Sequence, residues 1–345
     1  MSAAIGIIAN PMSGRDVRRM AARAGSSGPA EKRNEVARVV IGAVAAGAER
    51  VLVAREPFQI STGAVESLRI DAEIEVLEIE AKLRAEDTAR AAEAMRDAGC
   101  RVVVVLGGDG TNRAVARTWS DAPLVPLSTG TNNVFPKRVE PTLGGAAAGL
   151  VASGQLDLEE VSSRAKVVRV EIEGEADDLA LVDVALLVND IVGNLLPFDP
   201  SQIRCIVLSR AEPAAVGTSP IGGLLEPAGP CDDWGVAVDL ALDGPETHSL
   251  LAPIAPGLYR SFPIAAWRRL QLGECVTLEG PGVLAFDGDR ERKLAPGQAA
   301  HLRVLRDGPH VVDVDRAMAL AGRRGLLLDR TSWHDPYDRF LRHGT

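Results

Sequence analysis

An aspartate lies between glycines in the segment VVVVLGGDGTNRAVA, residues 102–116. The apolar run before it is typical of a strand at the centre of a parallel sheet. Glycines allow a tight turn with backbone close to a ligand, and the helix that follows offers free N–H groups to an anion. Because ligands bind at the carboxyl ends of such strands, Asp109 is predicted to face bound phosphate groups. The residues of this turn are Gly107, Gly108, Asp109, Gly110, Thr111 and Asn112.

A carboxylate beside phosphate is repulsive unless it has a chemical role. It can bind Mg²⁺ through water or accept a proton from an attacking hydroxyl, and both roles belong to phosphoryl transfer. The alternative is that Asp109 only caps the following helix. The chain has no Gly-Lys dipeptide, and Arg113 stands where a third glycine of G-x-G-x-x-G would fall. These departures exclude a P-loop NTPase and an ordinary dinucleotide dehydrogenase.

Two further polar turns follow apolar runs. The segment STGTNN comes after PLVPL, and NPMSGR comes after AIGIIA. Hydroxyls and amides at a strand end form a polar wall for phosphate, ribose or base, and an arginine balances phosphate charge. The candidate nucleotide-binding residues are Asn10, Ser13, Gly14, Arg15, Ser128, Thr129, Gly130, Thr131, Asn132 and Asn133.

The elements that position these turns alternate between strand and helix patterns in the first third of the chain. We predict an open, mostly parallel α/β domain over 1–140. Short strand-like segments separated by Pro, Gly and Asp then predict a mainly antiparallel β domain over 141–312, with a strand across 179–190 and a long loop at 211–230. The last unit, residues 313–345, is expected to consist of a helix at 313–325 and a tail, and to return to the first domain.

Bulk properties limit the partners. The formal net charge is −9, so the overall field repels nucleic acid and anionic lipid surfaces. The four cysteines form no C-x-x-C pair and the five histidines show no metal-binding spacing, so we expect no metal ligands in the protein. The N-terminus lacks the pattern of a signal peptide. We expect a cytoplasmic protein with a small-molecule substrate and no membrane or nucleic-acid partner, assembled as a homo-oligomer.

The order of N-P-x-S-G, G-G-D-G-T and S-T-G-T-N-N resembles the superfamily of NAD kinases and the diacylglycerol and sphingosine kinases. The surroundings GGDGTNRAVA and STGTNNVFP are most similar to its ATP-NAD kinase-like subgroup known as acetoin catabolism protein X. The resemblance covers most of the chain, because the change from α/β to β near residue 140 also matches the family layout.

This resemblance implies an NAD kinase-like fold and a phosphotransferase that uses ATP, with Mg²⁺ carried by the nucleotide. Asp109 matches the aspartate that activates the acceptor hydroxyl, and the implied acceptor is the 2′-hydroxyl of NAD. Asn189 and Asp190 resemble the pair that holds the dinucleotide, although a plain turn at a strand end is an equal alternative. Thr218 and Ser219 resemble part of a loop that encloses NAD.

The segment FDGDRE, residues 286–291, is similar to the late D-G-E element of the lipid kinases, with Asp287 and Asp289 as candidate auxiliary acids. A hairpin turn is the simpler interpretation and the one we favour. Two alternatives to NAD phosphorylation stay open. The acceptor could be a lipid or another small alcohol, or the protein could be a catalytically silent nucleotide-binding protein. Polyphosphate could also replace ATP as donor.

Overall fold

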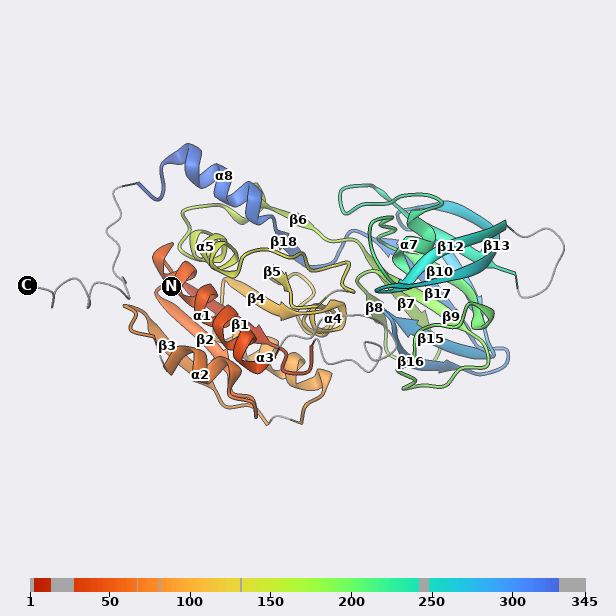
Figure 1. The fold of residues 1–345 in the computed structure, drawn as a ribbon, viewed down its shortest axis with the longest axis horizontal. Coiled ribbons are helices and arrows are strands. Elements are labelled where there is room, and N and C mark those ends of the chain that lie inside the picture. Colours follow the sequence, from red (N-terminus) through yellow and green to blue (C-terminus); the bar gives the residue numbers. More distant parts are fainter. Residues whose placement is uncertain are drawn as a thin grey trace, which may run out of the picture.

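The computed structural model describes residues 3–13, 28–66, 68–80, 82–130, 132–241 and 248–328. Within these residues an α/β domain and a β domain lie side by side (Figure 1). The candidate residues Gly14, Arg15 and Thr131 lie outside the described residues.

The first domain is built on a mostly parallel sheet. Its strand order is β3-β2-β1-β4-β5-β18-β6, in which β18 pairs parallel with β5 and antiparallel with β6. Every residue of β4 is buried, as the apolar sequence of this strand predicted. The strands are β1 (Ala4–Ala9), β2 (Arg50–Ala54), β3 (Glu73–Leu77), β4 (Val102–Gly107), β5 (Pro123–Ser128), β6 (Ser162–Arg164) and β18 (His310–Val312).

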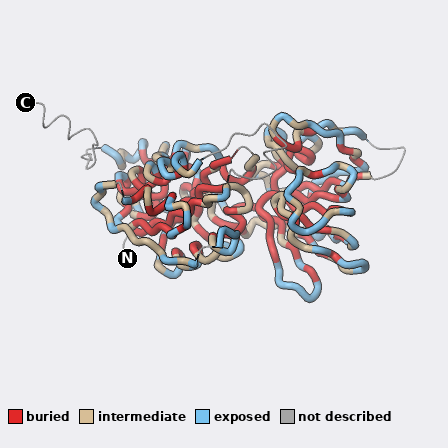
Figure 2. Tube along the Cα trace, turned by 60° about the horizontal axis from the view of Figure 1, so that its bottom comes forward, coloured by how far each residue is buried: buried red, intermediate tan, exposed pale blue. Residues whose placement is uncertain are grey.

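Helices cover both faces of this sheet, and the buried strands between them are visible in Figure 2. One apolar core joins the sheet to α1 (Pro29–Ala45), α2 (Ile60–Glu66), α5 (Pro141–Ala152) and α8 (Val314–Arg324). A second core joins the opposite face to α3 (Ala85–Asp97) and α4 (Asp109–Thr118). The short helix α6 (Leu158–Val161) precedes β6. The sheet is therefore the middle layer of three.

The described strands of the second domain form two antiparallel sheets with an apolar core between them. One sheet contains β7 (Val167–Ile172), β8 (Asp178–Ala180), β14 (Cys275–Glu279) and β17 (Ala299–Leu305). The other contains β9 (Asp183–Leu187), β10 (Ile203–Leu208), β11 (Trp234–Leu240), β12 (His248–Ala255), β13 (Leu258–Gln271), β15 (Gly282–Phe286) and β16 (Asp289–Leu294). The predicted fold class, an α/β domain followed by an antiparallel β domain, is confirmed.

Some details differ from the sequence prediction. The strand expected across 179–190 is divided into β8 and β9, and the loop expected at 211–230 contains the helix α7 (Ser219–Gly223). The chain enters the second domain between β6 and β7, later than the boundary placed at residue 140. It returns with β18, and α8 packs against α5.

Candidate active site

The polar turns after β1, β4 and β5 meet at one edge of the parallel sheet, because β4 lies between β1 and β5. They face a cavity of about 540 Å³ that is lined by residues of both domains. The lining includes the predicted residues Asn10, Ser13, Gly108, Asp109, Gly110, Thr111, Thr129, Gly130, Asn132, Asn133, Thr218, Asp287 and Asp289. The structure thus brings most of the candidate residues into one cleft.

Side-chain hydrogen bonds join the turns to one another. Asn10 Nδ2 donates to Thr111 Oγ1 at 2.8 Å, which connects the first turn to the glycine turn. Ser13 Oγ and Thr129 Oγ1 are 2.9 Å apart and connect the first turn to the third. Lys32 Nζ, from α1, donates to the carbonyl oxygen of Asn10 at 2.9 Å. Polar side chains of the protein therefore hold the three turns together without a ligand.

Three candidate residues that do not line the cleft support the turns: Gly107, Asn112 and Ser128. Asn112 Nδ2 donates to the Gly108 carbonyl at 2.9 Å, and Asn133 Nδ2 donates to Ser128 Oγ at 2.8 Å. Gly107 is required by close packing, because a Cβ there would lie 2.6 Å from the Thr111 side chain. These contacts fix the shape of the backbone that faces the ligand.

Asp109 is the first residue of α4, and its carboxylate does not bond to its own helix. Instead it accepts the N–H of Val134 at 3.1 Å and that of Phe135 at 2.8 Å. The N-cap residue, Gly108, has no side-chain cap. The helix-capping alternative is therefore wrong for Asp109, whose carboxylate is directed toward the third turn.

Two further carboxylates from the β domain lie near Asp109. Asp287 accepts the N–H groups of Leu181 at 2.9 Å, Val182 at 2.7 Å and Asp183 at 3.2 Å. Asp183 Oδ2 accepts the hydroxyl of Thr218 at 2.6 Å, whereas Asp183 Oδ1 has no hydrogen-bond partner within the described residues.

Burial of these acids raises their proton affinity. Desolvation, followed by the negative charge of Asp287, raises the pKa of Asp109 to about 7. Desolvation and the same neighbour raise the pKa of Asp183 to about 8. Burial also raises the pKa of Asp287, against the opposing charge of Arg113. A carboxyl with a pKa near neutrality can act as a general base at physiological pH.

Arg113 connects the cleft to the β domain. Its guanidinium lies 3.1 Å from Asp178 and 2.6 Å from Glu291, and its centre is 4.5 Å from the Phe286 ring. Arg113 and Asp178 are both 3% exposed. This arginine, which occupies the place of a third glycine in the sequence motif, is a charged contact between the domains.

The segment 286–291 forms the hairpin that we favoured and also borders the cleft. It forms a hairpin between β15 and β16, in which Asp287 and Gly288 have φ of 48° and 91°, as in a type I′ turn. The same turn places Asp287 and Asp289 in the lining of the cleft. The hairpin is therefore also part of the site.

Asn189, Asp190 and Ser219 are absent from the described lining of the cleft. Asp190 forms a buried ion pair with Arg290 at 3.0 Å. Ser219 Oγ donates to the carbonyl oxygen of Arg210 at 2.8 Å. The side chains of Asp190 and Ser219 are therefore engaged in contacts within the β domain.

Three charged residues near Asp109 were not predicted as functional from the sequence. They are Asp183, Arg210 and Arg113, whose ion pairs with Asp178 and Glu291 were not foreseen. Asp183 had a visible signal, an acid within the apolar segment LVDVALL. Such an acid in a buried strand must be paired or functional. The arginines gave no comparable signal, because their partners are distant in sequence.

Within the described residues, no group of three or more His, Cys, Asp or Glu side chains is arranged to hold a metal ion. The helices of the described chain are too short or too polar to cross a membrane.

Two family models match this chain, one in each domain. Residues 5–155 match the family model of the ATP-NAD kinase N-terminal domain. Residues 166–307 match the model of the acetoin catabolism protein X C-terminal domain. A diacylglycerol kinase structure from Bacillus anthracis str. Sterne aligns with a TM-score of 0.41 and 11% identity, over 90% of this chain and 96% of that one.

The α/β domain with its glycine-bracketed aspartate thus defines a protein with an NAD kinase-like, kinase-type fold. A curated relative from Cupriavidus necator, named acetoin catabolism protein X, is 36% identical over 335 residues, which cover 94% of this chain and 93% of the relative. The chain belongs to the acetoin catabolism protein X family.

Proposed function

We propose that the protein is an ATP-dependent phosphotransferase that phosphorylates an alcohol, with the 2′-hydroxyl of NAD as the first acceptor to test. The observation that carries the proposal is the position of Asp109, a half-buried carboxyl at the start of α4 among three joined polar turns, and desolvation raises its pKa to about 7. Asp109 accepts the proton of the acceptor hydroxyl while that oxygen attacks the γ-phosphorus and the bond to ADP breaks.

The remaining lining residues suit the phosphates and the sugar. The free N–H groups at the start of α4 favour anionic oxygens, and the hydroxyls of Ser13 and Thr129 add donors on the facing turns. Mg²⁺ enters with ATP as its counter-ion and supplies charge neutralisation. We infer that Asn10 and Lys32 act by holding the first turn in place.

A second candidate acceptor, a small uncharged alcohol, is favoured by the position of Asp190. This residue was expected to hold the dinucleotide, but it is buried in its ion pair with Arg290. The cleft wall near the β domain contains the apolar side chains of Leu196, Phe198 and Ile254. Such a wall suits an acceptor with an apolar body. The name of the curated relative also points to acetoin catabolism.

The experiment is NADP⁺ formation from NAD⁺, ATP and Mg²⁺ by purified protein, read with an NADP-specific cycling enzyme. Asp109→Asn should lower the rate about 10²–10⁴-fold, because it removes a positioned base. Asp121→Asn, an exposed aspartate, is the matched control and should keep wild-type activity.

Activity retained by folded Asp109→Asn would contradict the assigned base. No NADP⁺ from wild-type protein, together with ADP formation when a short-chain alcohol or diol replaces NAD⁺, would favour the second acceptor. Liposome co-sedimentation tests the lipid alternative. Tight nucleotide binding with no turnover on any acceptor, with either ATP or polyphosphate, would indicate a nucleotide sensor.

A further inference from the structure

Arg210 follows β10 in the β domain, and its side chain reaches the third polar turn of the α/β domain. Nη1 donates to the carbonyl oxygens of Val134 at 3.4 Å and Phe135 at 3.3 Å. The centre of the guanidinium lies 4.5 Å from the centre of the Phe135 ring. Arg210 is 3% exposed and is absent from the described lining of the cleft, so it lies behind the loop.

The peptide group between Val134 and Phe135 is held at both ends. Its carbonyl oxygen accepts from Arg210, and its N–H donates to Asp109 at 2.8 Å. A cation at a carbonyl oxygen polarises the amide and strengthens the hydrogen bond that its N–H donates. One peptide unit therefore transmits the charge of Arg210 to the carboxylate of Asp109.

We propose that Arg210 is a positioning residue for Asp109: through the 134–135 peptide it orients this carboxylate and lowers its proton affinity. The inference rests on the proposed function only in naming Asp109 the base. The contact itself concerns the orientation and titration of this carboxyl, whatever the acceptor is.

The other charges around Asp109 act in the opposite direction. Asp287, from the turn between β15 and β16, and Asp183, at the start of β9, are both negative when ionised. Arg113 opposes the charge of Asp287 and is not among the largest influences on Asp109. Among the largest influences on the pKa of Asp109, Arg210 is the cation, and its positive charge lowers this pKa.

Arg210 is fixed for this role from its own side. Its carbonyl oxygen accepts from Ser219 Oγ, and Glu212, Asp109 and Asp287 are the largest negative influences on its charge. Burial lowers the pKa of the guanidinium, and its Nε has no hydrogen-bond partner within the described residues. Burying a guanidinium carries a desolvation penalty. The contacts of Arg210 with the carbonyl oxygens of Val134 and Phe135 offset part of this penalty.

The contact crosses from one domain to the other. Val134 and Phe135 belong to the turn after β5, whereas Arg210 belongs to the β domain. A change in the spacing of the domains would break the bond from Arg210 to the peptide. Asp109 would then lose the contact that positions it, so its orientation as the base depends on contact between the two domains.

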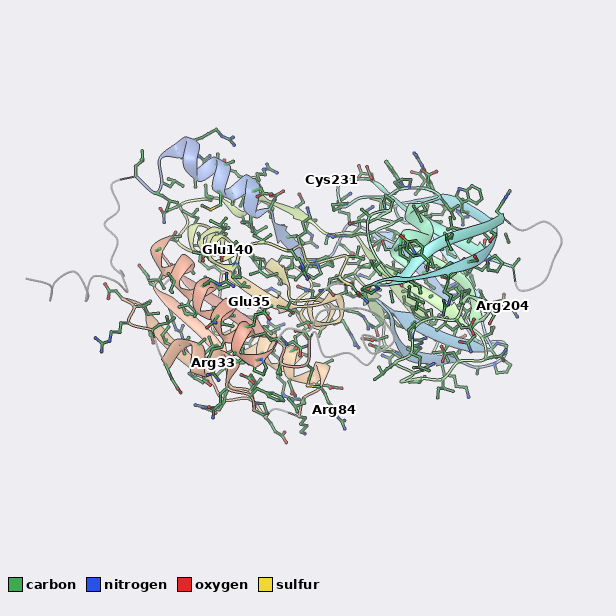
Figure 3. The ribbon with its side chains drawn as sticks, in the orientation of Figure 1. Arg33, Glu35, Arg84, Glu140, Arg204 and Cys231 are labelled. Carbon is green, nitrogen blue, oxygen red and sulfur yellow. The ribbon has the colours of Figure 1, made fainter. Side chains whose placement is uncertain are left out.

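The test uses Arg210→Met, which removes the charge, and Arg210→Lys, which keeps charge but loses the two-carbonyl geometry. Arg204→Lys is the matched control, since Arg204 is exposed on β10 and lies on the far side of the β domain from the cleft (Figure 3). Carboxyl ¹³C NMR titration, assigned by comparison with Asp109→Asn, gives the titration midpoint of Asp109 directly. Amide hydrogen exchange reports Val134 and Phe135.

We expect Arg210→Met to raise the midpoint of Asp109 by about one pH unit, a tenfold gain in proton affinity. Arg210→Lys should give a smaller rise, and both variants should speed exchange at the two amides. Arg204→Lys should match wild type. A wild-type midpoint in both folded Arg210 variants would overturn the proposal and leave Arg210 a packing residue.

If Arg210→Met fails to fold, the midpoint in Arg210→Lys decides. The titration needs no turnover, so its result is separate from that of the proposed function. A raised midpoint in a protein that phosphorylates no acceptor would support the contact with Asp109 and contradict the kinase activity. An unchanged midpoint in an active kinase would do the reverse.

Discussion

Asp109 can accept a proton only after it has lost its own, so its pKa sets the acid limb of the pH profile. With a pKa of about 7, the ionised fraction and the turnover should rise as pH increases through neutrality. Asp287→Asn removes a negative neighbour and should move this limb to lower pH. Rates measured from pH 5 to 9 for both proteins test the sign, and a limb that moves upward would contradict it.

Some residues in and around the cleft could be predicted from the sequence, and others could not. Asp109 and the turn residues could be predicted because they follow apolar strands within short motifs. Arg210 and Arg113 could not, because their roles depend on partners that the fold brings from other domains. Local sequence shows where a ligand binds, whereas charge balance in a buried cluster depends on tertiary contacts.

Helices α1 and α5 cross with their backbones in contact. A Cβ at Gly145 would lie 2.1 Å from the Val39 carbonyl oxygen, and one at Gly149 would lie 2.2 Å from that of Ala43. A backbone oxygen in a buried helix cannot move aside as the end of a side chain can. These glycines set the distance between the helices that cover the sheet behind the cleft.

Gly145→Ala should therefore destabilise the protein by about 1–3 kcal/mol or more, as overpacking does. Gly322→Ala is the matched control on α8, where a Cβ meets no atom within 4 Å. It should stabilise by roughly 0.5–1 kcal/mol, because alanine favours a helix interior over glycine. Chemical denaturation of both variants measures the difference. Equal stabilities would show that α1 and α5 separate freely.

The strand expected across 179–190 shows why element boundaries escaped prediction. Its sequence is apolar apart from Asp183 and the final Asn189-Asp190 pair, but the N–H groups of Leu181 and Val182 bind the side chain of Asp287 instead of a neighbouring strand. The ladder therefore ends between β8 and β9. A side chain that lies about a hundred positions later in the chain decides this break, and no local pattern contains it.

The buried acids give the whole molecule a stability that falls as pH rises. Asp109 and Asp183 have folded pKa values of about 7 and about 8, above the ordinary value of 3.8. Between about pH 4 and 8 the folded protein keeps protons that the unfolded chain releases, so higher pH favours unfolding.

Asp183→Asn should lose less stability than wild type between pH 5 and 8. The difference should be about 1.4 kcal/mol for each pH unit of this interval over which Asp183 is protonated in the folded protein but ionised in the unfolded chain. The free energy of unfolding, measured in denaturant at both pH values, gives the comparison. Any constant effect of the lost contact with Thr218 cancels in the difference. Parallel pH dependence in the two proteins would show that Asp183 stays ionised in the fold.

The first domain closes through a strand that comes late in the chain. β6 pairs with β18, which itself lies beside β5, and the strands of the second domain are encoded between β6 and β18. During translation, the sheet that supports the cleft therefore stays open at this edge until residues 310–312 have left the ribosome. A nascent chain must carry an uncovered strand edge through the synthesis of a complete second domain, which is the period when a chaperone would be needed most.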